Sequence, residues 1–216
     1  MEKPALLFDL DGTLLDTIAD IAAALNRALS LFGYPTYSVA EVLQMVGNGT
    51  AVLLSRALPN GADNPDYSRV LVEYKTYYAA HTMVATAPYD GILPLLDRLL
   101  AAGFRIGIVS NKFDSAVKEL ASRFFGGAIP VAIGESREVP RKPAPDGVRL
   151  ALRALGEEGL NAFLIGDSEV DIETARAAGI PCLSVGWGFR SREELMAYGA
   201  ERVFATPGEL AEYLLS

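Results

Sequence analysis

Short apolar runs separated by polar turns dominate the pattern of the chain. Near-continuous hydrophobic stretches occur at residues 5–8, 105–109, 131–133 and 162–165, and residues 181–185 and 202–204 extend the series. Runs of a few apolar residues are typical of strands that are covered on both faces. The pattern therefore predicts a buried sheet in which these runs are the strands.

Helical spacing separates these runs. Leu95, Leu96, Leu99 and Leu100 lie at helical spacing, and Gly103 is placed to end that helix. Residues that commonly cap helices stand at Asp114, Ser191 and Thr206. From about residue 104 onward strands and helices alternate, and this alternation predicts a parallel α/β sheet.

The segment from about residue 15 to residue 85 interrupts the alternation. Its apolar residues follow helical spacing, and we expect four helices that begin near residues 18, 38, 50 and 64. No run in this segment predicts a strand. We therefore expect a core made of residues 1–14 and 86–216, with residues 15–85 inserted as a helical lobe.

Composition limits the classes of function. The chain has 216 residues, a formal net charge of -8 and one cysteine, Cys182. This acidity disfavours nucleic-acid binding, and no apolar run approaches the roughly 18–20 residues of a membrane helix. The N-terminal residues lack the layout of a signal peptide, and the lone cysteine suits a reducing compartment. We expect a cytoplasmic protein without nucleic-acid or membrane partners, either a monomer or a homodimer.

A single histidine, His81, excludes several mechanisms. Neither a histidine-rich zinc site nor a two-histidine phosphatase can be built from it. The chain also lacks the G-x-S-x-G nucleophile elbow and the G-x-x-x-x-G-K-[ST] phosphate loop. Any chemistry must therefore come mainly from carboxylates, lysines and hydroxyls.

Two carboxylates follow the first predicted strand. Asp9 and Asp11 are two residues apart, so in a strand both would point to the same side. Neighbouring carboxylates repel unless a cation lies between them, and Mg²⁺ prefers such oxygen ligands. A strand that simply ends in a polar turn would explain the same residues.

Further polar residues follow later strands. Ser110 and Asn111 offer a hydroxyl and backbone amides before a helix, which suits a phosphate. Lys142 stands beside prolines, and a stiff loop of this kind can hold an ammonium against a phosphate. Asp167 and Asp171 are four apart, so they share a face if a helix begins at Asp167. Each feature alone also fits an ordinary loop or helix cap.

The combination is more specific than its parts, because the polar clusters follow the carboxyl ends of strands, where open α/β folds bind ligands. The chain resembles the haloacid dehalogenase-like superfamily, whose four motifs match Asp9-x-Asp11-Gly12-Thr13, Ser110, Lys142-Pro143 and Gly166-Asp167-Ser168-x-x-Asp171. The match spans the whole chain. Within the superfamily, residues 46–49 and 187–190 resemble the phosphoglycolate phosphatase branch.

This resemblance implies a fold, a metal and a set of roles. The fold would be a Rossmann-like parallel sheet with an α-helical cap. Asp9 would attack phosphorus and form an aspartyl-phosphate, while Asp11 would act first as acid and then as base. The implied ligands of Mg²⁺ are Asp9, the backbone carbonyl of Asp11, and Asp167, with Asp171 in support. The implied phosphate-binding residues are Ser110, Asn111 and Lys142.

The resemblance also narrows the reaction. Dehalogenases and phosphonatases of this superfamily lack an aspartate at the position of Asp11, so its presence favours hydrolysis of a phosphate monoester. The cap would close over the site and read the leaving group, with Asn48 and Arg56 as candidate contacts. A carboxylate-bearing ester such as 2-phosphoglycolate would suit a cationic cap residue.

Three other interpretations remain open at this stage. A sugar phosphomutase of the β-phosphoglucomutase type shares all four motifs, although Thr13 favours a phosphatase. A pyrophosphatase of the same superfamily is a second enzymatic alternative. A phospho-accepting receiver domain uses similar residues, but such domains are shorter and lack a helical insertion after the first strand.

Overall fold

The computed structural model describes residues 3–157 and 160–216 of the chain. The protein forms two compact units, one of Met1–Asp16 with Pro88–Ser216 and one of Thr17–Ala87. Each boundary falls two residues after the predicted one. Strands β2 (Leu15–Asp16) and β3 (Ala87–Pro88) explain the difference, because they pair in a two-stranded sheet at these positions. The expectation of no strand within residues 15–85 was therefore wrong for β2.

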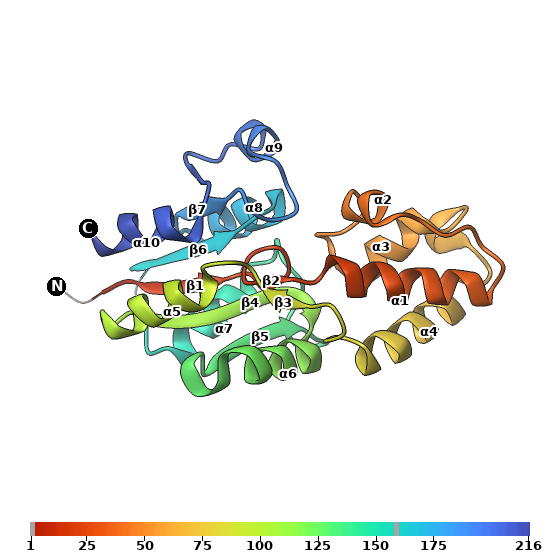
Figure 1. The fold of residues 1–216 in the computed structure, drawn as a ribbon, viewed down its shortest axis with the longest axis horizontal. Coiled ribbons are helices and arrows are strands. Elements are labelled where there is room, and N and C mark those ends of the chain that lie inside the picture. The colour runs from red at the N-terminus through yellow and green to blue at the C-terminus, as the bar shows by residue number, and fades with distance from the viewer. Residues whose placement is uncertain (1–2, 158–159) are drawn as a thin grey trace. The chain divides into compact units, whose positions relative to one another are not determined.

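The first unit is built around a six-stranded parallel sheet (Figure 1). The strand order is β5-β4-β1-β6-β7-β8, and the strands are β1 (Ala5–Phe8), β4 (Arg105–Phe113), β5 (Val131–Glu135), β6 (Ala162–Gly166), β7 (Cys182–Val185) and β8 (Val203–Phe204). Every predicted run is a strand, and the α/β Rossmann-like class is confirmed. Strand β4 is longer than expected, and its register with β5 shifts between Val109 and Phe113.

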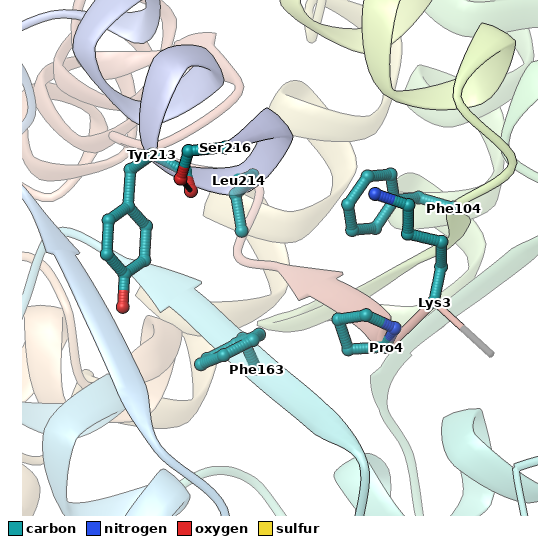
Figure 2. A pocket seen from close by; sticks show the side chains of 7 residues that line it. All are labelled: Lys3, Pro4, Phe104, Phe163, Tyr213, Leu214 and Ser216. Atoms are coloured by element: carbon teal, nitrogen blue, oxygen red, sulfur yellow. Dashed lines mark hydrogen bonds between the residues drawn. The ribbon is translucent and has the colours of Figure 1, made fainter. Parts of the chain in front are cut away.

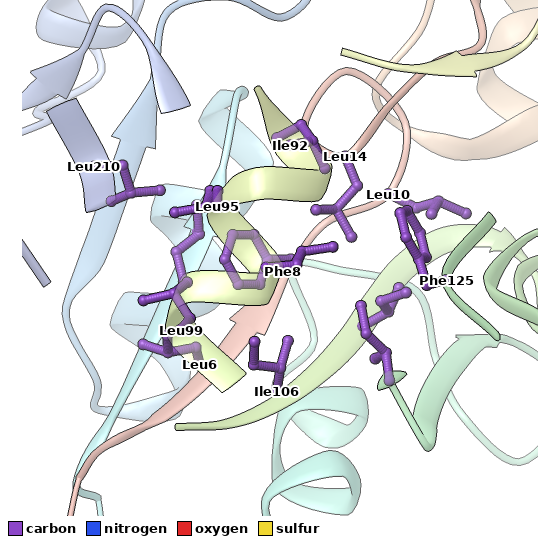
Figure 3. Close-up of a cluster of buried hydrophobic side chains, with 14 of the residues drawn as sticks. Leu6, Phe8, Leu10, Leu14, Ile92, Leu95, Leu99, Ile106, Phe125 and Leu210 are labelled. Atoms are coloured by element: carbon purple, nitrogen blue, oxygen red, sulfur yellow. The ribbon is translucent and has the colours of Figure 1, made fainter. Parts of the chain in front are cut away.

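Alternate residues of β1 pack against helices on the two faces of the sheet. Leu6 and Phe8 belong to one apolar cluster with residues of α5, α6 and α10 (Figure 3), whereas Ala5 and Leu7 belong to another with residues of α7 and α8. All four side chains are fully buried. The helices of this unit are α5 (Ile92–Ala101), α6 (Asp114–Phe125), α7 (Asp146–Ala154), α8 (Glu169–Ala178), α9 (Arg192–Ala197) and α10 (Pro207–Leu215), with a 3₁₀ turn at Gly126–Ala128.

The second unit is helical. It contains α1 (Ile18–Leu31), α2 (Val39–Leu43), α3 (Gly49–Ala57), a 3₁₀ turn at Gly61–Asp63, and α4 (Tyr67–Ala80). Helix α4 begins three residues after Asn64, because the Asn64 side chain accepts a hydrogen bond from the Asp66 backbone and forms a turn instead. No helix among the described residues is long and apolar enough to cross a membrane.

A buried carboxylate ties together the two ends of the second unit. Asp20, near the start of α1, is 4% exposed. Its oxygens accept hydrogen bonds from the backbone N–H groups of Val84, Ala85 and Thr86 and from the Thr86 hydroxyl, at 2.8–3.1 Å. Residues 84–86, at the end of the second unit, are thereby hydrogen-bonded to α1 at its beginning. Sequence analysis did not single out Asp20, because its donors are more than 60 residues away.

Replacing Asp20 with alanine should destabilise the second unit. The substitution leaves the buried N–H and hydroxyl of Thr86, and the N–H groups of Val84 and Ala85, without this acceptor, and we expect the unfolding free energy to fall by about 2–4 kcal/mol. Urea denaturation followed by circular dichroism measures this loss. The control is Asp63→Ala, which removes an exposed carboxylate from the same unit. Equal stability of the two variants would contradict the role assigned to Asp20.

Candidate active site

The sheet order brings the predicted catalytic residues together. Strand β1 lies between β4 and β6 and pairs in parallel with both. Asp9 follows β1, Asp167 follows β6, and Ser110 lies in the irregular end of β4. Since parallel strands end at the same edge of a sheet, residues that are over 100 positions apart share one region.

Lys142 lies among these carboxylates. Its Nζ is 3.0 Å from Oδ2 of Asp9 and 2.6 Å from Oδ1 of Asp171, and the lysine is 3% exposed. The Asn111 side chain holds the lysine backbone through two bonds: it accepts from the Lys142 N–H at 2.6 Å and donates to the Lys142 carbonyl at 3.1 Å. The side chain of Asn111 therefore positions Lys142, and the phosphate contact predicted from the sequence concerns the Asn111 backbone amide.

Asp167 and Asp171 meet in a way that sequence analysis did not foresee. They were expected to share a helix face, but α8 begins at Glu169, so Asp167 lies before the helix. Ser168 caps α8, and its N–H and hydroxyl both donate to Oδ2 of Asp171, at 3.2 and 2.6 Å. This cap turns Asp171 back toward the end of β6. Carboxylate oxygens of Asp9, Asp167 and Asp171 consequently lie within 4.8 Å of one another.

The electrostatics of this acidic group favour a bound cation. Burial raises the pKa of Asp167 to about 8, with further increases from Asp171 and Asp9. Burial likewise raises the pKa of Asp9 to about 6, although Lys142 opposes the increase. One lysine does not balance three buried carboxylates, and a divalent cation would supply the missing positive charge. The all-oxygen donor set fits Mg²⁺.

The loop after β7 fixes the orientation of Asp167. The Phe189 N–H and the Thr13 hydroxyl each donate to one oxygen of Asp167, both at 2.8 Å. Trp187 Nε1 donates to the Thr13 carbonyl at 2.9 Å. A Cβ at Gly188 would overlap the Asp167 side chain and the backbone of residue 12, so this close approach requires glycine. Sequence analysis had used this loop only as a family resemblance.

The Asp11 carboxylate has a different partner from Asp9. Strand β1 ends at Phe8, so the strand alternation that predicted a shared direction for Asp9 and Asp11 does not apply. Lys112 Nζ lies 2.8 Å from each oxygen of Asp11. Sequence analysis missed Lys112, although its spacing of two from Ser110 would have indicated the same side of an extended strand.

The two candidate contacts for the leaving group belong to the second unit. Asn48 occupies the N-cap position of α3, and Arg56 lies in the last turn of that helix. Arg56 Nη1 donates to the Met45 carbonyl at 2.8 Å. The guanidinium is therefore already bound within its own unit.

The first unit also has a pocket, whose lining residues Figure 2 shows. Lys3 and Pro4 precede β1, and Phe104 precedes β4, so the pocket lies at the amino ends of the strands. Phe163 and Tyr213 complete its aromatic lining. No aspartate or glutamate side chain is among its described lining residues, and the candidate catalytic residues Asp9 and Asp167 follow the opposite ends of the strands.

Comparison with known proteins decides the family. The family model of haloacid dehalogenase-like hydrolases matches residues 6–185. The chain belongs to this family. A phosphoglycolate phosphatase of Rhodospirillum rubrum is 33% identical over 219 residues, which cover 97% of this chain and 90% of the relative.

Solved structures agree with this assignment. A candidate phosphoglycolate phosphatase from Lactobacillus delbrueckii is 35% identical, with a TM-score of 0.94 over 99% of both chains. CbbY from Rhodobacter sphaeroides, solved with xylulose 1,5-bisphosphate, is 25% identical, with a TM-score of 0.77 over 96% of both chains. The predicted family and hydrolase class are thereby confirmed.

In the absence of a divalent cation, Asp9 and Asp167 should contribute more to stability at acidic than at alkaline pH. The folded-state pKa values of Asp9 and Asp167 exceed the ordinary value of 3.8, so the folded protein binds more protons than the unfolded chain. Their contribution to the unfolding free energy therefore falls as pH rises through about 4 to 8. Mg²⁺ favours the charged carboxylates, and it should raise the melting temperature more at pH 8 than near pH 5.5.

Thermal melts at the two pH values, with EDTA or with Mg²⁺, measure this difference. Asp167→Asn provides the matched variant, and we expect a weaker response to both pH and Mg²⁺. An equal Mg²⁺ response at both pH values, or a larger one at acidic pH, would contradict the acidic group as the cation site.

Proposed function

We propose that this hydrolase is a Mg²⁺-dependent phosphatase that cleaves small phosphate monoesters, with 2-phosphoglycolate as its preferred substrate. The observation that carries the proposal is the ion-paired group in which Lys142 contacts Asp9 at 3.0 Å and Asp171 at 2.6 Å, beside Asp167. The group combines a candidate nucleophile, Asp9, with the ammonium of Lys142 and with carboxylates that could bind a metal ion. Relatives that match most of the chain are named phosphoglycolate phosphatases, which supports the choice of substrate.

Asp9 is the proposed nucleophile. Its Oδ1 accepts a hydrogen bond from the Leu10 N–H at 2.7 Å, and Oδ2 contacts Lys142. These contacts fix the carboxylate in one orientation, as in-line attack on phosphorus requires. The product of attack is an aspartyl-phosphate, with the alcohol as leaving group.

Lys142, Ser110 and the Asn111 backbone are the proposed anchors of the phosphoryl oxygens. The Lys142 ammonium is buried, and Asp171 and Asp9 hold its pKa above the ordinary value although burial opposes the charge. A permanent buried cation stabilises the negative charge on the equatorial oxygens during transfer. Asp171 fixes the direction of this ammonium through the 2.6 Å contact.

The proposed ligands of Mg²⁺ are Asp9, the backbone carbonyl of Asp11, and Asp167. When bound, the cation would supply additional positive charge beside the transferring phosphoryl group. Thr13 and Phe189 hold both oxygens of Asp167. Asp11 donates a proton to the leaving alkoxide and later accepts one from the water that hydrolyses the aspartyl-phosphate.

Recognition of the leaving group is assigned to the second unit. Asn48 and Arg56 remain our candidates for its recognition. A cationic Arg56 would favour an anionic leaving group such as glycolate. The name of the relatives, phosphoglycolate phosphatase, supports the same leaving group.

A panel of phosphate esters tests the proposed substrate. With Mg²⁺ present, we expect kcat/KM for 2-phosphoglycolate to exceed that for ethyl phosphate by at least about tenfold, because ethyl phosphate lacks the carboxylate. Glucose 1-phosphate, pyrophosphate and a nucleoside monophosphate complete the panel. Released phosphate is measured for each, and isomerised sugar phosphate is measured separately. Asp9→Asn sets the background and should be inactive.

The panel distinguishes the proposed phosphatase from a mutase and from a pyrophosphatase. Isomerisation without net phosphate release would indicate a mutase, and preference for pyrophosphate would indicate a pyrophosphatase. Either result would overturn the proposed substrate. Full activity in a clean Asp9→Asn preparation would overturn the proposed nucleophile.

A further inference from the structure

Lys112 makes the best-defined contact of the Asp11 carboxylate. Both Asp11 oxygens lie 2.8 Å from Nζ of Lys112, so the ammonium bridges the carboxylate symmetrically. The Lys112 side chain is 5% exposed and the Asp11 side chain 19% exposed. A surface pair of long side chains contributes little, but a buried ammonium keeps a single orientation.

The backbone around Lys112 is also held. Its N–H donates to the Ser110 hydroxyl at 3.4 Å, within the irregular end of β4. Strand β4 pairs with β1, the strand that leads into Asp9 and Asp11. The lysine therefore projects from a strand that is fixed next to the turn carrying Asp11.

We propose that Lys112 is a positioning residue: in the acid form of Asp11, one oxygen accepts a hydrogen bond from the Lys112 ammonium while the other carries the proton toward the leaving-group oxygen. This inference rests on the proposed phosphatase activity, in which Asp11 transfers the proton. Removing the ammonium would leave Asp11 free to rotate, and a proton donor acts only within hydrogen-bond reach of its acceptor. Lys112 itself need not touch the substrate.

The dependence on the leaving group separates this role from a structural one. An alkyl ester needs a proton on its departing alkoxide, whereas p-nitrophenyl phosphate releases a stable phenolate. The ratio kcat/KM reports steps up to formation of the aspartyl-phosphate, so it isolates proton donation to the leaving group. A misoriented Asp11 should therefore lower kcat/KM for the alkyl ester much more than for the aryl ester.

Lys112→Met tests the inference because it keeps the length of the side chain and removes the charge. For the best alkyl ester of the panel we expect kcat/KM to fall by about 10- to 100-fold, part of the 10²–10⁴ ascribed to general acid catalysis. For p-nitrophenyl phosphate we expect a fall of less than about threefold. In the Asp11→Asn background, the same substitution should change the alkyl-ester value by less than about twofold.

The matched control is Lys118→Met. Lys118 forms a lysine–aspartate contact of similar length, 2.6 Å to Asp114, but its side chain is 61% exposed. This variant should retain both activities. Equal loss on both esters in Lys112→Met, or a further large loss in the Asp11→Asn background, would overturn the positioning role. A wild-type protein inactive on both esters would instead contradict the proposed function.

Discussion

Charge balance around Lys142 is the constraint on which the rest of the site depends. Three carboxylates, Asp9, Asp167 and Asp171, gather at one edge of the sheet, and Lys142 contacts two of them. Burial, and after it the neighbouring carboxylates, raise the pKa values of Asp9 and Asp167. Such an arrangement would be stabilised by further positive charge, which a metal ion would supply. A divalent cation would offset the two negative charges that Lys142 leaves uncompensated, and the site could then accept an anionic phosphate ester.

The fold holds this charged group with neutral and apolar contacts. Strand β1 is covered on both faces by hydrophobic clusters and flanked by β4 and β6, so the turn after Phe8 has little freedom. Around this turn, hydrogen bonds from neighbouring residues hold each charged group in place. Asn111 holds the backbone of Lys142, Ser168 holds Asp171, and the loop containing Phe189 holds Asp167. A preorganised site of this kind does not have to reorganise its dipoles when the reaction begins.

Sequence patterns predicted most of the sheet because buried strands leave a local signal. The runs at residues 5–8 and 162–165 are the strands β1 and β6. The motif residues were predictable because strand order places them at one edge. What the sequence could not reveal were contacts between distant residues: Asp20 with the segment at Val84, and Lys112 with Asp11. The prediction that Asp167 and Asp171 share a helix face was wrong because Ser168 caps the helix. Helix α8 therefore begins at Glu169, two residues after Asp167.

The most direct test of the account is to trap the covalent intermediate. Enzyme is mixed with excess 2-phosphoglycolate and Mg²⁺, quenched in acid within the first turnovers, and reduced with borohydride. Reduction converts an aspartyl-phosphate to homoserine, which peptide mass spectrometry locates in the sequence. The account predicts conversion at Asp9 that depends on both substrate and Mg²⁺. Conversion at Asp11 or Asp171, or none at any aspartate during measured turnover, would contradict it.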